Sequence, residues 1–125
     1  FNTGAVPKFD RGLPLKRTGV IFHAGIDRPI RADGCGMRAI ERMRIEMQSP
    51  RIGIGYSGND QSIHSGAVAV AYGATLIEKP YMVGEVPYSD SMEVNAPSEW
   101  AARCIDGIKE AEGMIGSSVV FPIRG

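Results

Sequence analysis

The sequence predicts an α/β fold in which parallel strands alternate with helices. Short apolar segments typical of buried strands occur three times, and segments of helical periodicity separate them. The order strand, helix, strand, helix, strand, loop, helix needs crossover connections, which make neighbouring strands parallel. The strand segments are continuous apolar runs, as expected for a sheet that is covered on both faces.

The first predicted strand is VIFHA, residues 20–24, which is short, apolar and rich in β-branched residues. A loop follows, in which Pro29 and Gly34 exclude regular structure. Residues 36–48 then show apolar residues at helical spacing, with arginine and glutamate on the opposite face, and Pro50 ends this helix. We expect the methionine-rich stripe of this helix to face the core; it consists of Met37, Ile40, Met43 and Met47, and Ile45 lies off it.

The second predicted strand covers residues 52–57, and the turn sequence GNDQ follows it. Residues 62–72 are predicted to form a helix of small residues, which Gly73 ends as the C′ residue. The third strand is residues 74–79. After a long loop, apolar residues recur at helical spacing and predict the last helix. This stripe consists of Trp100, Cys104, Ile105, Ile108, Ala111 and Ile115.

The composition is that of one ordinary globular domain and excludes several classes of protein. The chain has 125 residues, of which 43% are hydrophobic and 22% charged, and its formal net charge of zero gives no basic excess for nucleic acid. The longest apolar run, residues 67–72, is too short to cross a bilayer, and no secretory signal is visible. We expect Cys35 and Cys104 to be reduced thiols in a cytoplasmic protein, with Cys104 in the core; a disulfide is the alternative.

Polar side chains stand at the carboxyl ends of all three predicted strands. His23 lies at the end of the first, Tyr56 and Ser57 end the second, and Glu78 and Lys79 end the third. Ligands of parallel α/β folds bind at this edge, so we expect the final side chains of the three strands to share one cleft. Adjacent strand residues point to opposite faces, so Glu78 and Lys79 are not expected to pair with each other. The alternative is that these charges simply mark where each strand meets water, and that His23 is a hydrogen-bonded packing residue.

The segment IGYSGNDQSIHSGAVAVAYGATLIEKPYM, residues 54–82, resembles the sialic acid synthase family. These enzymes condense phosphoenolpyruvate to make N-acetylneuraminic acid and related nonulosonic acids, and their pattern is GYSDHT, a small-residue helix ending in LGA, and a strand ending in IEKHF. VIFHAGIDRPIRADGCGMRAI is similar to the family's LLHC strand, proline loop and NLRAI helix, and PYSDSMEVNAPSEW is similar to its PGPDHKASLEPDEL segment. The resemblance covers residues 20–116 and extends more loosely to FNTG at the start.

The resemblance implies a (β/α)8 barrel of the TIM type, of which this chain forms about the last half. A complete barrel takes about 250 residues. We expect residues 1–19 to be an irregular segment after a barrel strand, residues 20–116 to be the half-barrel, and residues 117–125 to be a C-terminal tail. An open half-barrel exposes strand edges, so we expect a homo-oligomer or the remainder of a longer chain to complete it. The start at Phe1 rather than at methionine agrees with a missing upstream segment.

The resemblance also implies roles for individual residues. Glu78 matches the family glutamate that contacts the amino sugar near the reacting carbons, and Lys79 matches the lysine that follows it, so these two are the predicted catalytic residues. Ser57 matches a serine beside the phosphoenolpyruvate site. The other predicted substrate-binding residues are Asp90, His23 and Thr3, which match family residues, and Asp27, which stands where the family has a substrate-binding asparagine.

The family holds a divalent metal such as manganese with two histidines, and this sequence has neither of them. Their positions are occupied by Asn59 and Pro80. Proline offers no side-chain ligand and asparagine offers only an amide oxygen, so we expect no metal site. A rebuilt cluster of Asn59, Asp60 and His64 is the alternative.

Two functions of different classes follow. The first is a divergent sialic or nonulosonic acid synthase-like transferase, or a fragment of one, which condenses phosphoenolpyruvate with an N-acetylated amino sugar. The second is a non-catalytic binding or structural module that descends from the barrel and has lost the metal site. The first predicts that the full-length protein supplies the family's upstream lysines and a replacement for the lost metal ligands. Asn59, Pro80 and Ser91 favour the second, because all three changes fall at chemical positions while the surrounding scaffold pattern survives.

Overall fold

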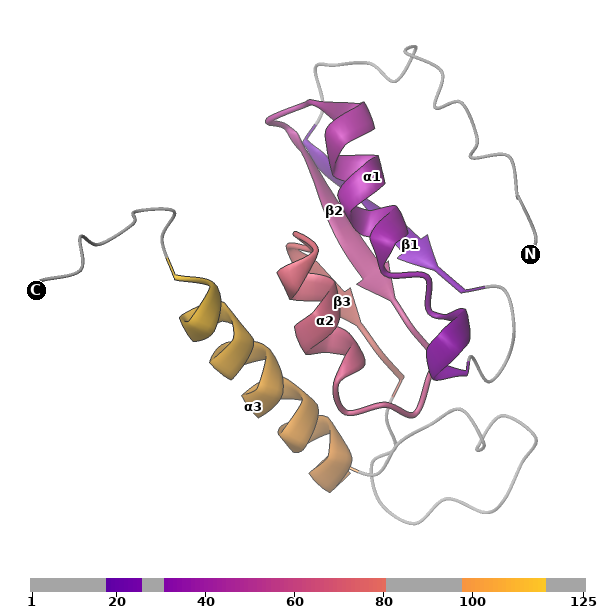
Figure 1. Cartoon of the computed structure of the whole chain (residues 1–125), viewed down its shortest axis with the longest axis vertical. Coiled ribbons are helices and arrows are strands. Elements are labelled where there is room, and N and C mark those ends of the chain that lie inside the picture. The colour runs from indigo at the N-terminus through magenta and orange to yellow at the C-terminus, as the bar shows by residue number, and fades with distance from the viewer. Residues whose placement is uncertain (1–17, 26–30, 81–97, 117–125) are drawn as a thin grey trace, which may run out of the picture.

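The structure is a computed structural model that describes residues 18–25, 31–80 and 98–116, and its elements alternate as the sequence predicts (Figure 1). The elements in chain order are β1 (Gly19–Ala24), the 3₁₀ helix η1 (Ala32–Gly34), α1 (Arg38–Met47), β2 (Ile52–Ser57), α2 (Ser65–Ala71), β3 (Leu76–Glu78) and α3 (Ser98–Ile115).

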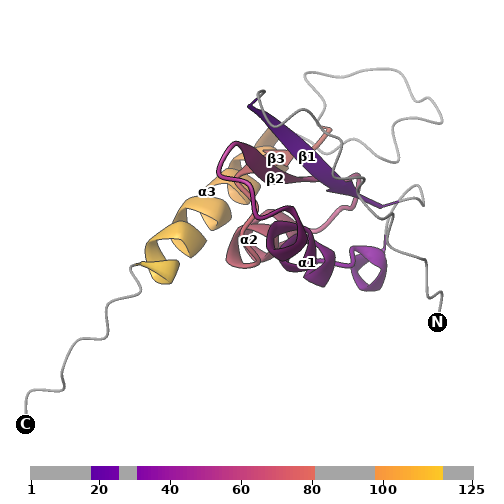
Figure 2. The ribbon, with the colours of Figure 1, turned by 90° about the horizontal axis from the view of Figure 1, so that it is seen from above.

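The three strands form one parallel sheet in the order β1-β2-β3. Its register places Ala24 beside Ser57 and Ser57 beside Glu78, so the carboxyl ends of the strands are level with one another. Figure 2 shows α1 and α2 on the same face of this sheet. The opposite face, which we call the open face, is not covered by any of the described helices. The predicted α/β architecture with parallel strands is therefore confirmed.

The hydrophobic core lies between the sheet and the two helices α1 and α2. Ile40 of α1 and Tyr56 of β2 are fully buried, and Met43 and Ile54 are nearly so. Ile40 and Met43 belong to the predicted methionine-rich stripe, whereas Ile45, which lies off that stripe, is 58% exposed. The helical periodicity of the sequence thus predicts the core-facing side of α1 correctly.

The helix α2 begins at Ser65, three residues later than the predicted start at Ser62. The carboxylate of Asp60 accepts a hydrogen bond from the backbone N–H of Ser62 at 3.0 Å, and the hydroxyl of Ser62 accepts one from the N–H of His64 at 3.1 Å. These local side-chain bonds satisfy backbone groups in a turn and so compete with helix formation. The predicted end is correct, because Gly73 follows α2 with a φ of +97°.

The strand β3 is shorter than the predicted residues 74–79. The N–H of Ala74 donates to the carbonyl of Ala69 at 3.0 Å, so Ala74 caps the C-terminal end of α2 and lies outside the sheet. The loop before α1 also differs from the prediction, because Ala32–Gly34 form a single 3₁₀ turn closed by the N–H of Gly34 and the carbonyl of Arg31. Gly34 was predicted to exclude regular structure, but a glycine at the end of a single 3₁₀ turn does not prevent that turn from forming.

The helix α3 packs against α2 through a close contact between Ile108 and Gly66. A Cβ at Gly66 would lie 2.7 Å from Cδ1 of Ile108, so only glycine allows this approach without a shift. Cys104 is buried as predicted, but Ile105 and Ile115 of the same predicted stripe are each 51% exposed. The described part of the chain therefore covers only part of the apolar face of α3.

Both cysteines, Cys35 and Cys104, are buried and free, in agreement with the prediction that they do not form a disulfide. No helix in the described ranges combines the length and the apolar character that crossing a membrane would need.

Candidate functional site

The register of the sheet sorts the strand-end side chains onto two faces. Residues at paired positions of parallel strands point to the same side, and successive residues of one strand point to opposite sides. Tyr56 pairs with His23 on one side and with Ile77 on the other, and Tyr56 and Ile77 pack into the core beneath the helices. Ser57 and Glu78, which pair with each other, therefore project from the open face.

Ser57 and Glu78 form a hydrogen-bonded pair, which we call the open-face pair. The hydroxyl of Ser57 donates to Oε1 of Glu78 at 3.0 Å, and Glu78 is exposed. The backbone N–H of Gly58 donates to the carbonyl of Glu78 at 3.0 Å and closes the ladder at the same level. An accessible carboxylate beside a hydroxyl offers acceptors for the hydroxyl and amide hydrogens of a polar ligand and one donor for an anionic oxygen.

Apolar residues lie beside the open-face pair on the same face of the sheet. Gly55, two residues before Ser57, pairs with Phe22 of β1 and with Leu76 of β3. A Cβ at Gly55 would lie 2.7 Å from the ring of Phe22 and 3.0 Å from the carbonyl oxygen of Leu76. Glycine is therefore required here, because it lets the Phe22 ring lie over the strand β2.

Lys79 lies on the opposite side of the sheet from the open-face pair, as the alternation of strand residues requires. Its ammonium group donates to Oδ2 of Asp60 at 2.8 Å, to the carbonyl of Asp60 at 3.1 Å and to the hydroxyl of Ser65 at 2.6 Å. The side chains of Lys79 and Asp60 are only 8% and 1% exposed. The prediction that Glu78 and Lys79 do not pair with each other is confirmed.

Asp60 is the centre of a buried polar cluster, which we call the buried network and define as Tyr56, Asp60, Ser65 and Lys79. The phenol of Tyr56 donates to Oδ2 of Asp60 at 2.7 Å. Burial raises the pKa of the Asp60 carboxyl, but hydrogen bonds from Lys79, Tyr56 and Ser65 outweigh it and hold that pKa below its usual value. Burial is the main cause that raises the pKa of Tyr56 far above its usual value, and the neighbouring Cys35 and Asp60 raise it further. Asp60 is therefore ionised and Tyr56 neutral at physiological pH.

His23 lies on the helix side of the sheet and is separated from the open-face pair. Its Nε2–H donates to the carbonyl of Cys35 at 2.7 Å, and its ring centroid lies 6.1 Å from that of Tyr56. The expectation that the final side chains of all three strands share one cleft is therefore wrong for His23, because the register pairs it with Tyr56 and not with Ser57. Its predicted substrate-binding role stays a prediction, and the geometry agrees with the packing alternative.

The described residues do not fit the divalent metal of the sialic acid synthases. Pro80 has no ligand atom, and Asp60 is already committed to the buried network. Oδ1 of Asn59 is buried and accepts no hydrogen bond within the described ranges, but a lone amide oxygen is a weak metal ligand. His64 is exposed, and no group of three or more His, Cys, Asp or Glu side chains in the described part of the chain is placed to hold a metal ion.

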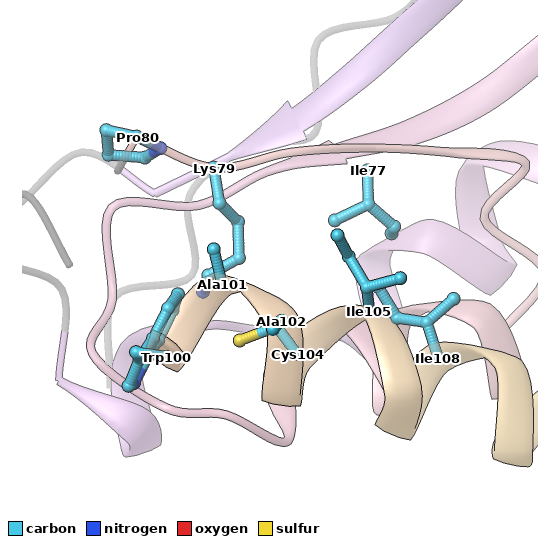
Figure 3. Close-up of a pocket in the computed structure, with 9 residues that line it drawn as sticks. All are labelled: Ile77, Lys79, Pro80, Trp100, Ala101, Ala102, Cys104, Ile105 and Ile108. Atoms are coloured by element: carbon cyan, nitrogen blue, oxygen red, sulfur yellow. The ribbon is translucent and has the colours of Figure 1, made fainter. Parts of the chain in front are cut away.

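A cavity of about 450 Å³ lies between the end of β3 and α3, and it is separate from the open-face pair (Figure 3). It is lined by Ile77, Lys79, Pro80, Trp100, Ala101, Ala102, Cys104, Ile105 and Ile108. Figure 3 shows Ile77 and Lys79 both pointing toward α3. The ammonium of Lys79 lies 5.0 Å from the centre of the Trp100 ring, a cation–π contact that joins α3 to the buried network.

Three of the predicted substrate-binding residues, Thr3, Asp27 and Asp90, lie outside the described residues. The buried network is the feature that the sequence analysis missed. A signal for it was present, because the residue after Glu78 must face the helices, and a buried ammonium needs a carboxylate. Asp60 is the only acidic residue between Glu46 and Glu78.

A parallel sheet with crossover helices and polar side chains at its carboxyl edge is typical of α/β proteins that bind ligands at that edge, and comparisons with known proteins identify the kind of α/β fold. Three of the solved structures that the chain matches have TM-scores of 0.70 to 0.71. N-acetylneuraminic acid (sialic acid) synthetase from Leptospira borgpetersenii is 23% identical, with 82% of this chain and 35% of that one covered. A protein named for spore coat polysaccharide biosynthesis, protein E, from Chromobacterium violaceum is 24% identical over 84% of this chain and 31% of that one. Spore coat polysaccharide biosynthesis protein spsE from Bacillus subtilis is 20% identical over 84% and 29%.

The model of the NeuB family matches residues 14–120, and the chain belongs to that family. The structural similarity at these identities establishes the fold alone, a part of a TIM-type barrel. This chain spans about a third of the length of the structures it matches. A search of curated proteins found no match.

Proposed function

We propose that this chain is part of a sialic or nonulosonic acid synthase-like protein that condenses phosphoenolpyruvate with an N-acetylated amino sugar. Membership of the NeuB family supports this class of reaction. The observation that carries the proposal is the open-face pair, because Ser57 and Glu78 meet at the carboxyl edge of a parallel sheet, where barrel enzymes bind their substrates.

The chemistry of the open-face pair suits two different ligands side by side. The carboxylate of Glu78 accepts hydrogen bonds from hydroxyl or amide hydrogens, which an N-acetylated amino sugar supplies. The hydroxyl of Ser57 can turn from Glu78 to donate to an anionic oxygen of phosphoenolpyruvate. In this arrangement Glu78 orients the sugar beside the anion that Ser57 binds, and proximity lowers the barrier to carbon–carbon bond formation.

A non-catalytic module is the second candidate, and one observation favours it. Asn59 and Pro80 stand where the synthases have metal-binding histidines, and the described residues offer no other group suited to a metal. A barrel that lost this Lewis acid would need another source of charge stabilisation to remain an enzyme.

Phosphate release from phosphoenolpyruvate in the presence of N-acetylmannosamine tests the proposal in the full-length protein. We expect turnover in the natural protein and a loss of about 10²- to 10³-fold in Glu78→Gln, which keeps the shape of the side chain but removes its charge. Lys109→Met, at an exposed position on α3, is the control and should keep full activity. Absence of turnover together with absence of a ligand-induced thermal shift would favour the non-catalytic module.

A further inference from the structure

The side chain of Lys79 is committed to the helix side of the sheet and does not reach the open-face pair. All three hydrogens of its ammonium group are accepted, two by Asp60 and one by Ser65, at 2.6 to 3.1 Å. The side chain is 8% exposed. A buried ammonium with a full set of acceptors has no hydrogen left for a substrate.

The buried network joins four segments of the chain at one place. Asp60 accepts hydrogen bonds from Tyr56 of β2, from the N–H of Ser62 in the following loop and from Lys79 after β3. Ser65, the first residue of α2, accepts the remaining hydrogen of Lys79. The ends of β2 and β3 are therefore linked to each other through side chains on the helix side of the sheet.

Each member of the open-face pair is the chain neighbour of a member of the buried network. Ser57 follows Tyr56, and Glu78 precedes Lys79. Neighbouring residues of a strand are joined through the backbone but point to opposite faces. The hydrogen bonds that hold Tyr56 and Lys79 on the helix side therefore also hold the backbone from which Ser57 and Glu78 project. The hydrogen bond from the N–H of Gly58 to the carbonyl of Glu78 lies at the same level and reports whether the two strand ends stay together.

We propose that Lys79 is a positioning residue rather than a catalytic one, and that its buried ion pair with Asp60 holds the ends of β2 and β3 so that Ser57 and Glu78 act together. The effect on catalysis rests on the proposed function, in which the open-face pair binds the substrates. The effect on the strand ends does not rest on it.

A double-mutant cycle in the full-length protein separates positioning from direct contact. Lys79→Met leaves Asp60 without its cation, Asp60→Asn leaves Lys79 without its anion, and the double variant removes both charges. We expect each single variant to lower kcat by at least about tenfold, and the double variant to lose less than the product of the two single losses. Lys109→Met on the exposed side of α3 is the matched control and should leave kcat unchanged. If Lys79 instead touched a substrate, its full loss would persist in the double variant, and this result would overturn the proposal.

Hydrogen exchange supplies a second measurement that needs no turnover. The amide of Gly58 should exchange at least about tenfold faster in Lys79→Met, whereas the amide of Thr75, which donates to the carbonyl of Ile54 at 2.8 Å at the other end of β3, should keep its protection. The double variant should recover much of the protection of Gly58. Unchanged exchange at Gly58 in Lys79→Met would contradict the positioning role even in a protein without synthase activity.

The double variant also carries the test if Lys79→Met does not fold. A folded double variant in which the Gly58 amide is protected from exchange would support the proposal, because removing both charges together would leave the strand ends in place. A double variant that is unfolded as well would show that Lys79 supports the whole domain and not the strand ends, and would overturn the proposal.

Discussion

At the scale of single residues, successive side chains of a strand point to opposite faces, so the neighbouring charges Glu78 and Lys79 lie in different environments. Glu78 is exposed on the open face and bonded to Ser57, whereas Lys79 is buried on the helix side and bonded to Asp60. Two opposite charges at the end of an apolar strand are tolerated because each has its own environment. The buried ammonium avoids the large cost of an unpaired charge only because Asp60 meets it at 2.8 Å.

Asp60 makes the stability of the domain sensitive to acid. Its folded-state pKa lies below the usual value of 3.8, so its contribution to the free energy of unfolding is present above about pH 4 and is lost as the pH falls through the folded-state pKa. We expect the natural protein to lose stability steeply below about pH 4 and Asp60→Asn to lose less over the same range, as followed by urea unfolding at a series of pH values. Asp106→Asn, at an exposed position on α3, is the control and should behave as the natural protein. Equal acid sensitivity of Asp60→Asn and the natural protein would contradict this role of Asp60.

The sequence predicted these residues unevenly, for a physical reason. The positions of Ser57 and Glu78 at strand ends follow from local pattern, and so does the opposite facing of Lys79. The partner of Lys79 does not, because Asp60 lies 19 positions away and reaches it only through the way the loop folds. The expectation that His23 shares a cleft with Ser57 and Glu78 failed because the face of His23 depends on the register between β1 and β2, which the sequences of the strands alone do not determine.

At the scale of elements, the tight turn between α2 and β3 sets where the third strand begins. Gly73 has a φ of +97°, a conformation that side chains with a Cβ rarely adopt, and a Cβ there would lie 3.1 Å from the side chain of Arg44. The starts of α2 and β3 were predicted less accurately than their ends. The side chains of Asp60 and Ser62 delay the start of α2, and the hydrogen bond from Ala74 back to Ala69 delays the start of β3.

We expect Gly73→Ala to lower the free energy of unfolding by about 1 to 3 kcal/mol, because alanine at this φ is strained. Denaturation in urea measures the change. Gly113→Ala on α3 is the matched control, because a Cβ there meets no atom within 4 Å and alanine favours a helix, so stability should stay the same or rise. A Gly73→Ala variant as stable as the natural protein would show that the turn does not depend on glycine.

At the scale of the whole molecule, the described sheet has helices on one face only. Leu76 and Val20 on its open face are 47% and 40% exposed, and each outer strand of the described sheet is paired on one side alone. Apolar residues and free strand edges of this kind favour association with other protein. Because the chain spans about a third of the length of the structures it matches, we propose that further strands of a barrel cover this face in the complete protein.

The 125-residue chain studied by itself should therefore associate through its open face. We expect sedimentation velocity to detect concentration-dependent association, and Leu76→Lys to shift the distribution toward monomer. Ile45→Lys, which changes a more exposed residue on α1 at 58% exposure, should have no such effect. If both substitutions reduced association equally, the association would be non-specific and would not occur through the open face.

The parallel order of the elements was predictable from the sequence, because alternating strand and helix patterns leave few arrangements of crossover connections. The barrel itself was accessible only through resemblance, because the described residues contain three of its strands and closure depends on strands beyond them. The expected covering of both sheet faces, inferred from the continuous apolar runs, is met on the helix side alone in the described part of the chain.

A crystal structure of the full-length protein grown with phosphoenolpyruvate and N-acetylmannosamine tests the central claim most directly. We predict that ligand density lies on the open face, with the sugar within hydrogen-bond distance of Glu78 and an anionic oxygen within reach of Ser57, while Lys79 stays bonded to Asp60. Ligand seated instead in the cavity between β3 and α3, or an open face that stays empty at saturating ligand, would contradict the assignment of Ser57 and Glu78 to substrate binding.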